Sequence, residues 1–343
     1  MKSNNSKKRI AINGFGRIGR LTFRNLLKND ELEVVAINDL TDNATLAHLL
    51  KYDSAHGQFD GTIEATENAL IVNGKEIRCS AIRNPEELPW KELEVDLVLE
   101  CTGIFRDKEK AGKHLKAGCK DVILSAPAKG DGVQTIVLGV NDDQLDRRKN
   151  IFSNASCTTN CLAPLIKILD TNFGIQVGSM TTTHAYTADQ RIQDAPHSDL
   201  RRARAAAYNI VPTSTGAAKA VKLVYPEIGN KISAIAVRVP VITGSMVELN
   251  VMVDKSTSVE EVNAKFKEAA EGAMHGVLQY ATDPLVSSDI VRNTHSSIFD
   301  SLMTDVTQGN FIKVVSWYDN EAGYSARLAD FASVFLTKKR IQH

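Results

Sequence analysis

The first forty residues constrain the fold more than any other part of this chain. A short apolar run at Arg9–Ile12 leads into the glycine-rich segment Asn13–Arg20, and an amphipathic pattern then continues to about Lys28. A second apolar run follows at Leu32–Asp39. A strand, a glycine-rich turn, a helix and another strand, in this order, are typical of a βαβ unit. Such a unit joins two parallel strands through a crossover helix, so we expect a parallel sheet here.

The glycines of this turn have the spacing of a dinucleotide-binding loop. Gly14, Gly16 and Gly19 match the pattern G-x-G-x-x-G, and Asp39 lies 20 residues after Gly19, at the end of the next strand. The first glycine permits the tight turn, the second lets the backbone approach a diphosphate, and the third lets the helix pack closely on the sheet. The helix N-terminus then receives the diphosphate. A carboxylate at Asp39 accepts hydrogen bonds from ribose hydroxyls and repels a 2′-phosphate, which favours NAD. The alternative is a glycine-rich turn without a ligand.

Further strand signals occupy the rest of the first half. The apolar runs are Val95–Gly103, Asp121–Ser125 and Thr135–Val140. Short apolar runs with helical segments between them indicate a Rossmann-type, doubly wound α/β sheet of mostly parallel strands. Ligands bind at the carboxyl ends of such strands, so Thr102 and Ser125 are candidate cofactor-side residues, although each is equally consistent with a plain strand-end cap. Residues 60–80 alternate more strongly and predict an inserted antiparallel pair with a turn at Val72–Lys75.

The pattern changes in the second half of the chain. Strands are expected at Ile175–Ala185, Ile232–Val239, Met246–Val253 and Phe311–Tyr318, and helices at Gly216–Leu223 and Val259–Glu271. These elements predict a second, α+β domain with a large mixed or antiparallel sheet. The last segment, about Tyr324–Lys338, predicts an amphipathic helix that packs back on the first domain. The polar, arginine-rich stretch Thr187–Ala207 is long enough for a functional loop, and the alternative is a solvated surface loop.

Cys157 lies in a turn of small and hydroxyl residues directly before a predicted helix. The helix dipole and the free N–H groups at such a position favour the thiolate and can hold an oxyanion. The neighbouring hydroxyls of Ser156 and Thr158 add donors for an anion. His184, at the end of a predicted strand 27 residues later, is a candidate base for this cysteine. A half-buried cysteine in a capped helix and a structural histidine are the alternatives.

Composition excludes several classes of function. The 343 residues contain 41 Lys and Arg and 41 Asp and Glu, a balance that argues against nucleic-acid or polybasic membrane binding. No apolar run approaches the roughly 18 residues of a membrane span, and the polar residues 1–8 do not resemble a secretion signal. Five cysteines favour a reducing cytoplasm over a disulfide framework. Cys157 and Cys161 lie four residues apart on one helix face, but a metal would need further ligands that no Cys-x-x-Cys or paired-His spacing supplies, so no metal site is expected.

Taken together, these segments resemble phosphorylating glyceraldehyde-3-phosphate dehydrogenase over nearly the whole chain. The resemblance rests on Ile12–Arg20, Ser153–Pro164, His184–Thr187, Arg201–Ala207, Pro212–Val221, Val237–Pro240 and Ser316–Glu321. It implies glycolytic oxidation of D-glyceraldehyde 3-phosphate to 1,3-bisphosphoglycerate with NAD and inorganic phosphate. The covalent steps would run through a hemithioacetal and a thioester on Cys157, with His184 as the base. It also implies a homotetramer, in which residues 1–156 and the final helix 321–343 bind NAD and residues 157–320 carry catalysis.

The resemblance assigns further residues by matching position. The implied NAD contacts, beyond the glycines, are Arg17, Ile18, Asp39, Arg83, Ser125 and Asn320. The implied site for the substrate's own phosphate is Thr187 with Arg238. The implied site for inorganic phosphate is Ser156, Thr158, Thr215 and Gly216, with support from Arg202.

Two positions depart from the family pattern. Ala322 stands where members often have a bulkier residue, and Asp194-Ala195-Pro196 partly resembles both NAD-using and NADP-using members. Asp39 favours NAD, with some use of NADP left open. The nearest alternative is erythrose-4-phosphate dehydrogenase, which typically lacks the threonines and glycine seen here at Thr187, Thr215 and Gly216. A cysteine hydrolase would have no use for the glycine-rich turn, and a purely regulatory nucleotide-binding protein would have no use for the Cys–His pair.

Overall fold

The computed structural model describes residues 7–339 and 343. Residues 1–6 of the predicted polar segment, and 340–342 of the predicted final helical region, lie outside the described residues. The chain forms two compact units. The first unit comprises Met1–Ile136, Gln144–Ala155 and Ser325–His343, and the second comprises Val137–Asp143 and Ser156–Tyr324.

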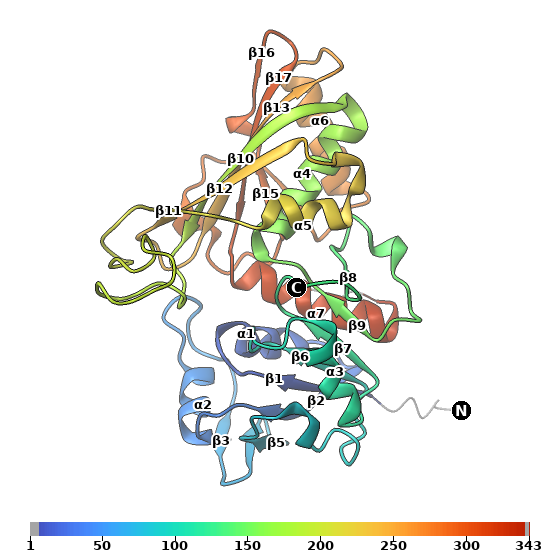
Figure 1. Ribbon diagram of the computed structural model, residues 1–343, viewed down its shortest axis with the longest axis vertical. Helices are drawn as coiled ribbons and strands as arrows, with labels where there is room; N and C mark the ends of the chain where they lie inside the picture. The colour runs from blue at the N-terminus through green and yellow to red at the C-terminus, as the bar shows by residue number, and fades with distance from the viewer. Residues whose placement is uncertain (1–6, 340–342) are drawn as a thin grey trace. The chain divides into compact units, whose positions relative to one another are not determined.

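A nine-stranded sheet forms the centre of the first unit (Figure 1). Its strand order is β3-β4-β5-β2-β1-β6-β7-β9-β8. The strands are β1 (Lys8–Asn13), β2 (Leu32–Asn38), β3 (Ile63–Ala65), β4 (Ala69–Val72), β5 (Lys75–Ser80), β6 (Leu97–Glu100), β7 (Asp121–Leu124), β8 (Gln134–Thr135) and β9 (Ile151–Ser153). The helices are α1 (Arg17–Leu26), α2 (Asn43–Lys51), α3 (Lys108–Lys116) and α7 (Ala322–Thr337), of which α7 begins in the second unit. From β5 to β8 every pair is parallel, which confirms the predicted Rossmann-type sheet.

Of two local predictions in this unit, the antiparallel pair with its turn at Val72–Lys75 is confirmed, and the strand Thr135–Val140 needs correction. The hairpin turn is found at Asn73-Gly74, where both residues have positive φ, as a tight hairpin requires. However, β5 also pairs in parallel with β2, so the hairpin extends the main sheet and is not a separate insertion. The predicted strand Thr135–Val140 ends at Thr135. Residues 136–138 are buried without being part of a strand, and their burial explains the apolar run.

The second unit is built on an eight-stranded mixed sheet, ordered β11-β12-β10-β13-β17-β15-β14, with β16 beside β17 (Figure 1). The strands are β10 (Ile175–Ala185), β11 (Val211–Thr213), β12 (Ile232–Val239), β13 (Ser245–Val253), β14 (Leu278–Ala281), β15 (Ser297–Asp300), β16 (Asp305–Thr307) and β17 (Phe311–Tyr318). The helices are α4 (Cys157–Phe173), α5 (Ala217–Val224) and α6 (Val259–Glu271). The predicted α+β domain with a mixed sheet is confirmed.

One face of this sheet is covered and the other is open. Helix α4 contacts β10, β13, β15 and β17, while α5 contacts β12 and α6 contacts β14. Along β13, buried residues alternate with more exposed ones, as expected when alternate side chains point to opposite faces. Val177, Met252 and Phe311 are cross-strand neighbours, and all three are exposed large apolar side chains. The sheet therefore presents an uncovered apolar row opposite the helices.

Candidate active site

Helix α4 begins at Cys157, as the sequence predicts. Ser156 is the N-cap: its Oγ accepts a hydrogen bond of 3.1 Å from the backbone N–H of Thr159 and lies 2.7 Å from the Thr159 hydroxyl. An N-cap of this kind satisfies one of the free donors of the first turn and fixes where the helix starts. Cys157 is thereby held at the positive end of the helix dipole.

His184 and Cys157 face one another although they come from different elements. His184 is buried near the end of β10, and its Nε2 lies 3.5 Å from Cys157 Sγ. Its Nδ1 lies 2.7 Å from the carbonyl oxygen of Ala185. If Nδ1–H donates to that carbonyl, Nε2 is the acceptor that faces the thiol. A thiol and an imidazole nitrogen therefore face one another at 3.5 Å.

Arg238 completes this cluster. It lies on β12 directly opposite His184 in the parallel register of the sheet. Its Nη1 lies 2.9 Å from His184 Nδ1 and donates a 3.1 Å hydrogen bond to the carbonyl oxygen of Ala185. A permanent positive charge therefore stands beside the imidazole ring.

The electrostatics of the pair correct one expectation. A cysteine at a helix N-terminus predicts a lowered pKa, but burial raises the pKa of the Cys157 thiol, against the opposing effects of Arg238 and of hydrogen bonds from Thr158. Burial, and then the charge of Arg238, lowers the pKa of His184 to about 3. A Cys157 thiolate alone and a protonated His184 alone are thus each disfavoured. A thiolate forms here most readily by passing its proton to His184, because opposite charges at this distance attract strongly.

Sequence reasoning missed Tyr318 as a member of the site. Its hydroxyl lies 2.9 Å from the hydroxyls of both Thr158 and Thr182, and its ring packs edge-on against His184. Burial raises the pKa of Tyr318 well above its usual range, so it stays a neutral phenol. One signal in the sequence pointed to a hydroxyl beside His184. Thr182 is two residues before His184 on a strand, so both side chains point to the same face.

Beyond Ser156, Thr158 and Arg238, the residues predicted to hold phosphates are Thr187, Arg202, Thr215 and Gly216, all in the second unit. The N–H of Thr187 donates a 3.4 Å hydrogen bond to Gln190 Oε1. Gly216 is the N-cap of α5 without a side-chain cap, and Thr215 Oγ1 accepts a 3.2 Å hydrogen bond from the N–H of Ala217. The first turn of α5 thus has backbone donors available to an anion.

Arg202 is brought to the segment that precedes Thr215. Its Nε donates to Thr213 Oγ1 at 3.0 Å and its Nη2 to the carbonyl oxygen of Ser214 at 3.3 Å. Its Nη1 lies 2.5 Å from Asp189 Oδ2. The guanidinium is therefore already paired with a carboxylate, which favours a supporting electrostatic role over a direct grip on phosphate.

In the first unit, the geometry of the glycine-rich turn fits a dinucleotide. Gly14 has a φ of +91°, and a Cβ there would lie 2.7 Å from the backbone nitrogen of Thr102. A Cβ on Gly19 would lie 2.2 Å from the carbonyl oxygen of Gly14. Gly16, by contrast, has open space beside it and caps α1 with no side chain. The first-turn N–H groups, including those of Arg17 and Ile18, are therefore accessible to a diphosphate.

Two carboxylates fix this turn. Asp39 accepts a 2.7 Å hydrogen bond from the N–H of Phe15 on Oδ2 and a 3.0 Å bond from the N–H of Thr41 on Oδ1. Asp53 binds the Arg17 guanidinium through both oxygens, at 2.6 and 3.1 Å. Although burial acts to raise it, hydrogen bonds from His56 and Arg17 hold the pKa of Asp53 far below its usual range. The Arg17 side chain is thus committed, and its contact with a diphosphate would be through the backbone.

The remaining predicted cofactor residues lie at several strand ends. Ser125 follows β7, and its N–H donates to the carbonyl oxygen of Glu100 at 2.9 Å. Arg83 follows Ile82, whose N–H donates to Asn38 Oδ1 at 2.9 Å. Asn320 belongs to the second unit, where its Oδ1 accepts a 2.9 Å hydrogen bond from the hydroxyl of Ser245.

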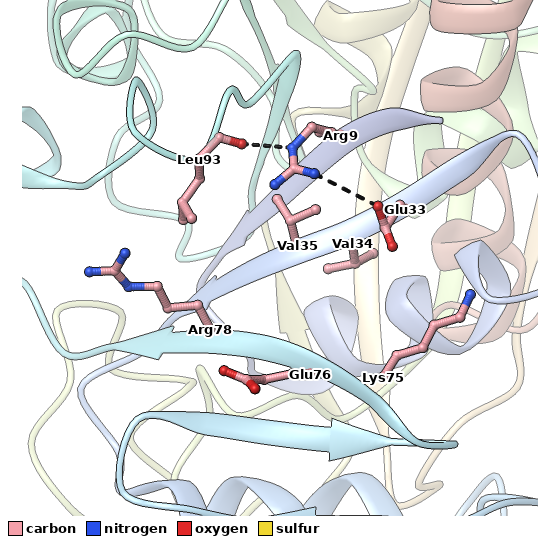
Figure 2. A pocket seen from close by; sticks show the side chains of 8 residues that line it. All are labelled: Arg9, Glu33, Val34, Val35, Lys75, Glu76, Arg78 and Leu93. Atoms are coloured by element: carbon pink, nitrogen blue, oxygen red, sulfur yellow. Dashed lines mark hydrogen bonds and ion pairs between the residues drawn. The ribbon is translucent and has the colours of Figure 1, made fainter. Parts of the chain in front are cut away.

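A separate pocket in the first unit lies at the other end of the parallel strands from the glycine-rich turn. Figure 2 shows its lining near the start of β1 and β2, where Arg9 Nη1 lies 3.9 Å from Glu33 and Arg9 Nε donates to the carbonyl oxygen of Leu93 at 2.8 Å. Gly14 and Asp39 follow the far ends of these same strands. This pocket is therefore distinct from the dinucleotide cradle.

Three further features bear on function. Among residues 7–339 and 343 there is no group of three or more His, Cys, Asp and Glu side chains arranged to hold a metal ion. None of the helices within these same residues is long and apolar enough to cross a membrane. All five cysteines carry free thiols.

Comparison with known proteins gives matches along most of the chain. Residues 8–108 match the family model described as glyceraldehyde 3-phosphate dehydrogenase, NAD binding domain, and residues 156–320 match the model of the C-terminal domain of the same family. A glyceraldehyde-3-phosphate dehydrogenase of Thermotoga maritima is 58% identical over 330 residues, which cover 96% of this chain and 99% of the relative. The enzyme of Geobacillus stearothermophilus is 56% identical over 331 residues, covering 96% and 98%.

Proposed function

This chain belongs to the glyceraldehyde 3-phosphate dehydrogenase family, and we propose that it catalyses the glycolytic oxidation of D-glyceraldehyde 3-phosphate to 1,3-bisphosphoglycerate with inorganic phosphate. NAD is its cofactor. The observation that supports this chemistry best is the 3.5 Å approach of His184 Nε2 to Cys157 Sγ, with the Arg238 guanidinium beside the same imidazole. A nucleophile, its base and a fixed cation for an anionic substrate then stand in one cluster.

In the first step, Cys157 acts as the nucleophile. The thiol proton passes to His184 Nε2 while Sγ forms a bond to the aldehyde carbon, and the carbonyl oxygen becomes an oxyanion. The N–H groups at the start of α4 stabilise this oxyanion, which then takes the proton from His184 Nε2 to give a hemithioacetal and a neutral imidazole. The Tyr318–Thr158 hydrogen bond holds the first turn of this helix in place.

In the second step, His184 acts as general base. It removes the hydroxyl proton of the hemithioacetal as the C–H electron pair leaves as hydride, and the carbon becomes a thioester carbonyl. Bound NAD supplies the acceptor for that hydride. Inorganic phosphate then attacks the thioester, forming a C–O bond and breaking the C–S bond, so that the acyl phosphate leaves and Cys157 is regenerated. The thioester preserves the free energy of oxidation that hydrolysis would lose.

Two anion sites serve the two phosphates in this proposal. Arg238 with Thr187 binds the phosphate of the substrate. Thr158, Thr215 and Gly216, with Ser156, bind inorganic phosphate, and Arg202 adds positive charge next to them. The N-cap geometry of Gly216 and the contacts of Arg202 with Thr213 and Ser214 support this assignment.

We assign NAD binding to residues 1–156 together with 321–343, and catalysis to residues 157–320. Asn320 is proposed as a further nicotinamide contact. The bond from Ser245 to Asn320 Oδ1 supports this role, because it leaves the Asn320 amide group to act as a donor.

A homotetramer in the cytoplasm is the proposed assembly and location. Large apolar side chains in the region 187–210 are strongly exposed, with Ile192 at 90% and Tyr208 at 86%. Exposed apolar surface of this extent supports burial against other copies of the chain. The five free thiols are suited to a reducing compartment.

Absorbance of NADH during turnover tests the proposal. With NAD and D-glyceraldehyde 3-phosphate, sustained NADH formation should require inorganic phosphate. Without phosphate, we expect a burst of one NADH per active site followed by a stall. Full turnover without phosphate would indicate that water hydrolyses the thioester. Faster turnover of erythrose 4-phosphate would favour erythrose-4-phosphate dehydrogenase activity.

A further inference from the structure

Four adjacent parallel strands of the first unit end on polar side chains that form one hydrogen-bonded row. The last residues of β5, β2, β1 and β6 are Ser80, Asn38, Asn13 and Glu100, and the sheet register places them side by side. Ser80 Oγ donates to Asn38 Oδ1 at 3.0 Å, and Asn38 Nδ2 donates to Asn13 Oδ1 at 2.7 Å. Asn13 Nδ2 donates to Glu100 Oε2 at 2.5 Å. We call these four residues the terminal row.

Glu100 is the end of the terminal row and is almost completely buried. Its Oε2 accepts hydrogen bonds from Asn13 and, at 3.0 Å, from His114 Nε2. Its Oε1 accepts a 2.8 Å hydrogen bond from the N–H of Thr102 and another from the Thr102 hydroxyl. Every direct partner of this side chain is therefore a donor.

The protonation of His114 is fixed by a tryptophan. Trp90 Nε1 lies 3.0 Å from His114 Nδ1, and both side chains are fully buried. An indole N–H can only donate, so Nδ1 must be unprotonated and the ring proton must be on Nε2. That proton points to Glu100. Trp90 thus selects the tautomer that binds the carboxylate.

Three members of the terminal row, Asn13, Asn38 and Glu100, directly precede or hold a segment that the proposed function assigns to NAD. Gly14 follows Asn13, and Asp39 follows Asn38. Asn38 also binds both the N–H and the carbonyl oxygen of Ile82, at 2.9 Å each, next to Arg83. Glu100 holds Thr102, whose backbone lies against Gly14.

We propose that the terminal row is a positioning device for NAD, in which the Glu100 carboxylate, oriented by His114 and Trp90, sets the geometry of the strand-end loops that bind the cofactor. This inference rests on the proposed function and extends it to residues that need not touch NAD. The row has a direction, because every amide in it donates toward Glu100 and accepts from the other side. A change at Glu100 therefore reaches Asn38 and Ile82 through reoriented amides.

The substitution Glu100→Gln tests this directly, because it keeps the shape and replaces one carboxylate oxygen by an NH₂ group. Wherever that group points, it meets donors: Thr102 on one side, or Asn13 and His114 on the other. We expect the dissociation constant of NAD, measured by calorimetry on the cofactor-free protein, to rise by at least about tenfold, a scale typical of losing an orienting partner. The iodoacetamide reactivity of Cys157 without NAD should not change.

A second variant makes the test specific to the proton on His114. Trp90→Phe keeps a packed aromatic ring but removes the indole donor, so His114 is free to move its proton to Nδ1 and accept at Nε2. The NH₂ group introduced by Glu100→Gln then gains an acceptor. We expect Trp90→Phe alone to bind NAD within about threefold of wild type, and the double variant to bind more tightly than Glu100→Gln alone. If the two substitutions acted only as packing defects, the double variant would instead bind NAD more weakly than Glu100→Gln alone.

Leu70→Ala is the matched control, since Leu70 is fully buried in β4 of the same sheet and outside the terminal row. It should lower the melting temperature while leaving the NAD dissociation constant unchanged. The proposal is overturned if Glu100→Gln lowers only the melting temperature, or if the double variant binds NAD no better than Glu100→Gln. It is also overturned if neither Glu100→Gln nor the double variant folds. Wild-type protein that does not oxidise glyceraldehyde 3-phosphate but does bind NAD would contradict the proposed function and leave this test intact.

Discussion

The five cysteines differ in acidity because their burial and neighbouring charges differ. Burial raises the pKa of Cys79 to about 11 and that of Cys101, Cys119 and Cys161 to about 12. The pKa of Cys157 is also raised, but Arg238 and Thr158 oppose the shift. Iodoacetamide at pH 7 should therefore alkylate Cys157 first and abolish activity, as peptide mass mapping against residual activity would record. Faster labelling of another cysteine, with activity intact after Cys157 is labelled, would contradict the assignment.

His184 should govern the pH at which Cys157 reacts. In the wild type, the thiol proton can move to Nε2, 3.5 Å away, so alkylation persists near neutrality. In His184→Asn, the thiol must ionise into a buried environment that raises its pKa, so the alkylation profile should move to higher pH. The turnover number should fall by roughly 10²–10⁴, the usual scale for a general base. NAD binding and the melting temperature should stay close to wild type, and a variant that simply unfolds would favour a structural role for His184.

Arg238 is expected to discriminate between phosphorylated and plain aldehydes. Removing a charge-assisted contact costs roughly 1.5–3 kcal/mol, or about 10- to 150-fold. Arg238→Leu should lower kcat/KM by this factor for glyceraldehyde 3-phosphate and much less for glyceraldehyde. Arg238→Leu also removes the contact with His184 Nδ1, and that loss affects both substrates equally. Only the ratio of the kcat/KM values for the two aldehydes therefore reports phosphate binding. Equal losses for the two aldehydes would assign Arg238 to His184 alone.

The sequence predicts single residues of the candidate site more readily than it predicts which of them are in contact. Cys157 and His184 each have a local signature, a helix start and a strand end. Their approach depends on how β10 passes the start of α4, which no local pattern encodes. Tyr318 was missed for the same reason: its partners Thr182 and Thr158 are 136 and 160 residues away in sequence.

At the scale of the element, the glycine-rich turn ties cofactor choice to loop geometry. Asp39 accepts a hydrogen bond from Phe15, between Gly14 and Gly16, so it supports the turn in addition to its proposed contact with the ribose. Asp39→Asn keeps an acceptor for that N–H and loses the charge that repels a 2′-phosphate. Asp39→Gly loses both.

Both substitutions should therefore raise NADP use relative to NAD, measured as the ratio of kcat/KM values. Only Asp39→Gly should also weaken binding of both cofactors, because it frees the turn. A wild-type preference for NADP would overturn this view of Asp39 and give weight to Ala195. Equal NAD affinity in the two variants would show that the Phe15 contact does not matter.

Elements with a clear period were predicted well, and those with a buried but irregular backbone were not. The strands Ile175–Ala185 and Ile232–Val239 and the helix Val259–Glu271 have the predicted bounds. The strand predicted at Thr135–Val140 was wrong beyond Thr135, because burial of a turn produces the same apolar run as a strand. The short strand β9 carried too little sequence to give a period.

At the scale of the whole molecule, the second unit leaves two apolar surfaces uncovered. One is the row of Val177, Met252 and Phe311 on the open face of the sheet. The other is the region 187–210, which is held by local backbone hydrogen bonds and by the bridge between Arg191 and Ala205, and which exposes Ile192 and Tyr208. Exposed apolar side chains on a polar, ion-paired loop are costly in a monomer, so both surfaces favour assembly.

Charge placed on the second surface should therefore dissociate the proposed tetramer. We expect wild-type protein to sediment as a tetramer and the double variant Ile192→Glu/Tyr208→Glu to shift toward smaller species, because a glutamate buried in an interface is strongly disfavoured. Its apparent dissociation should decrease as protein concentration rises, since assembly follows mass action. Asn68→Glu is the control: it adds the same kind of charge at an exposed position of the first unit and should leave the sedimentation unchanged. A wild-type monomer, or a double variant that sediments like the wild type, would show that these side chains are exposed for another reason.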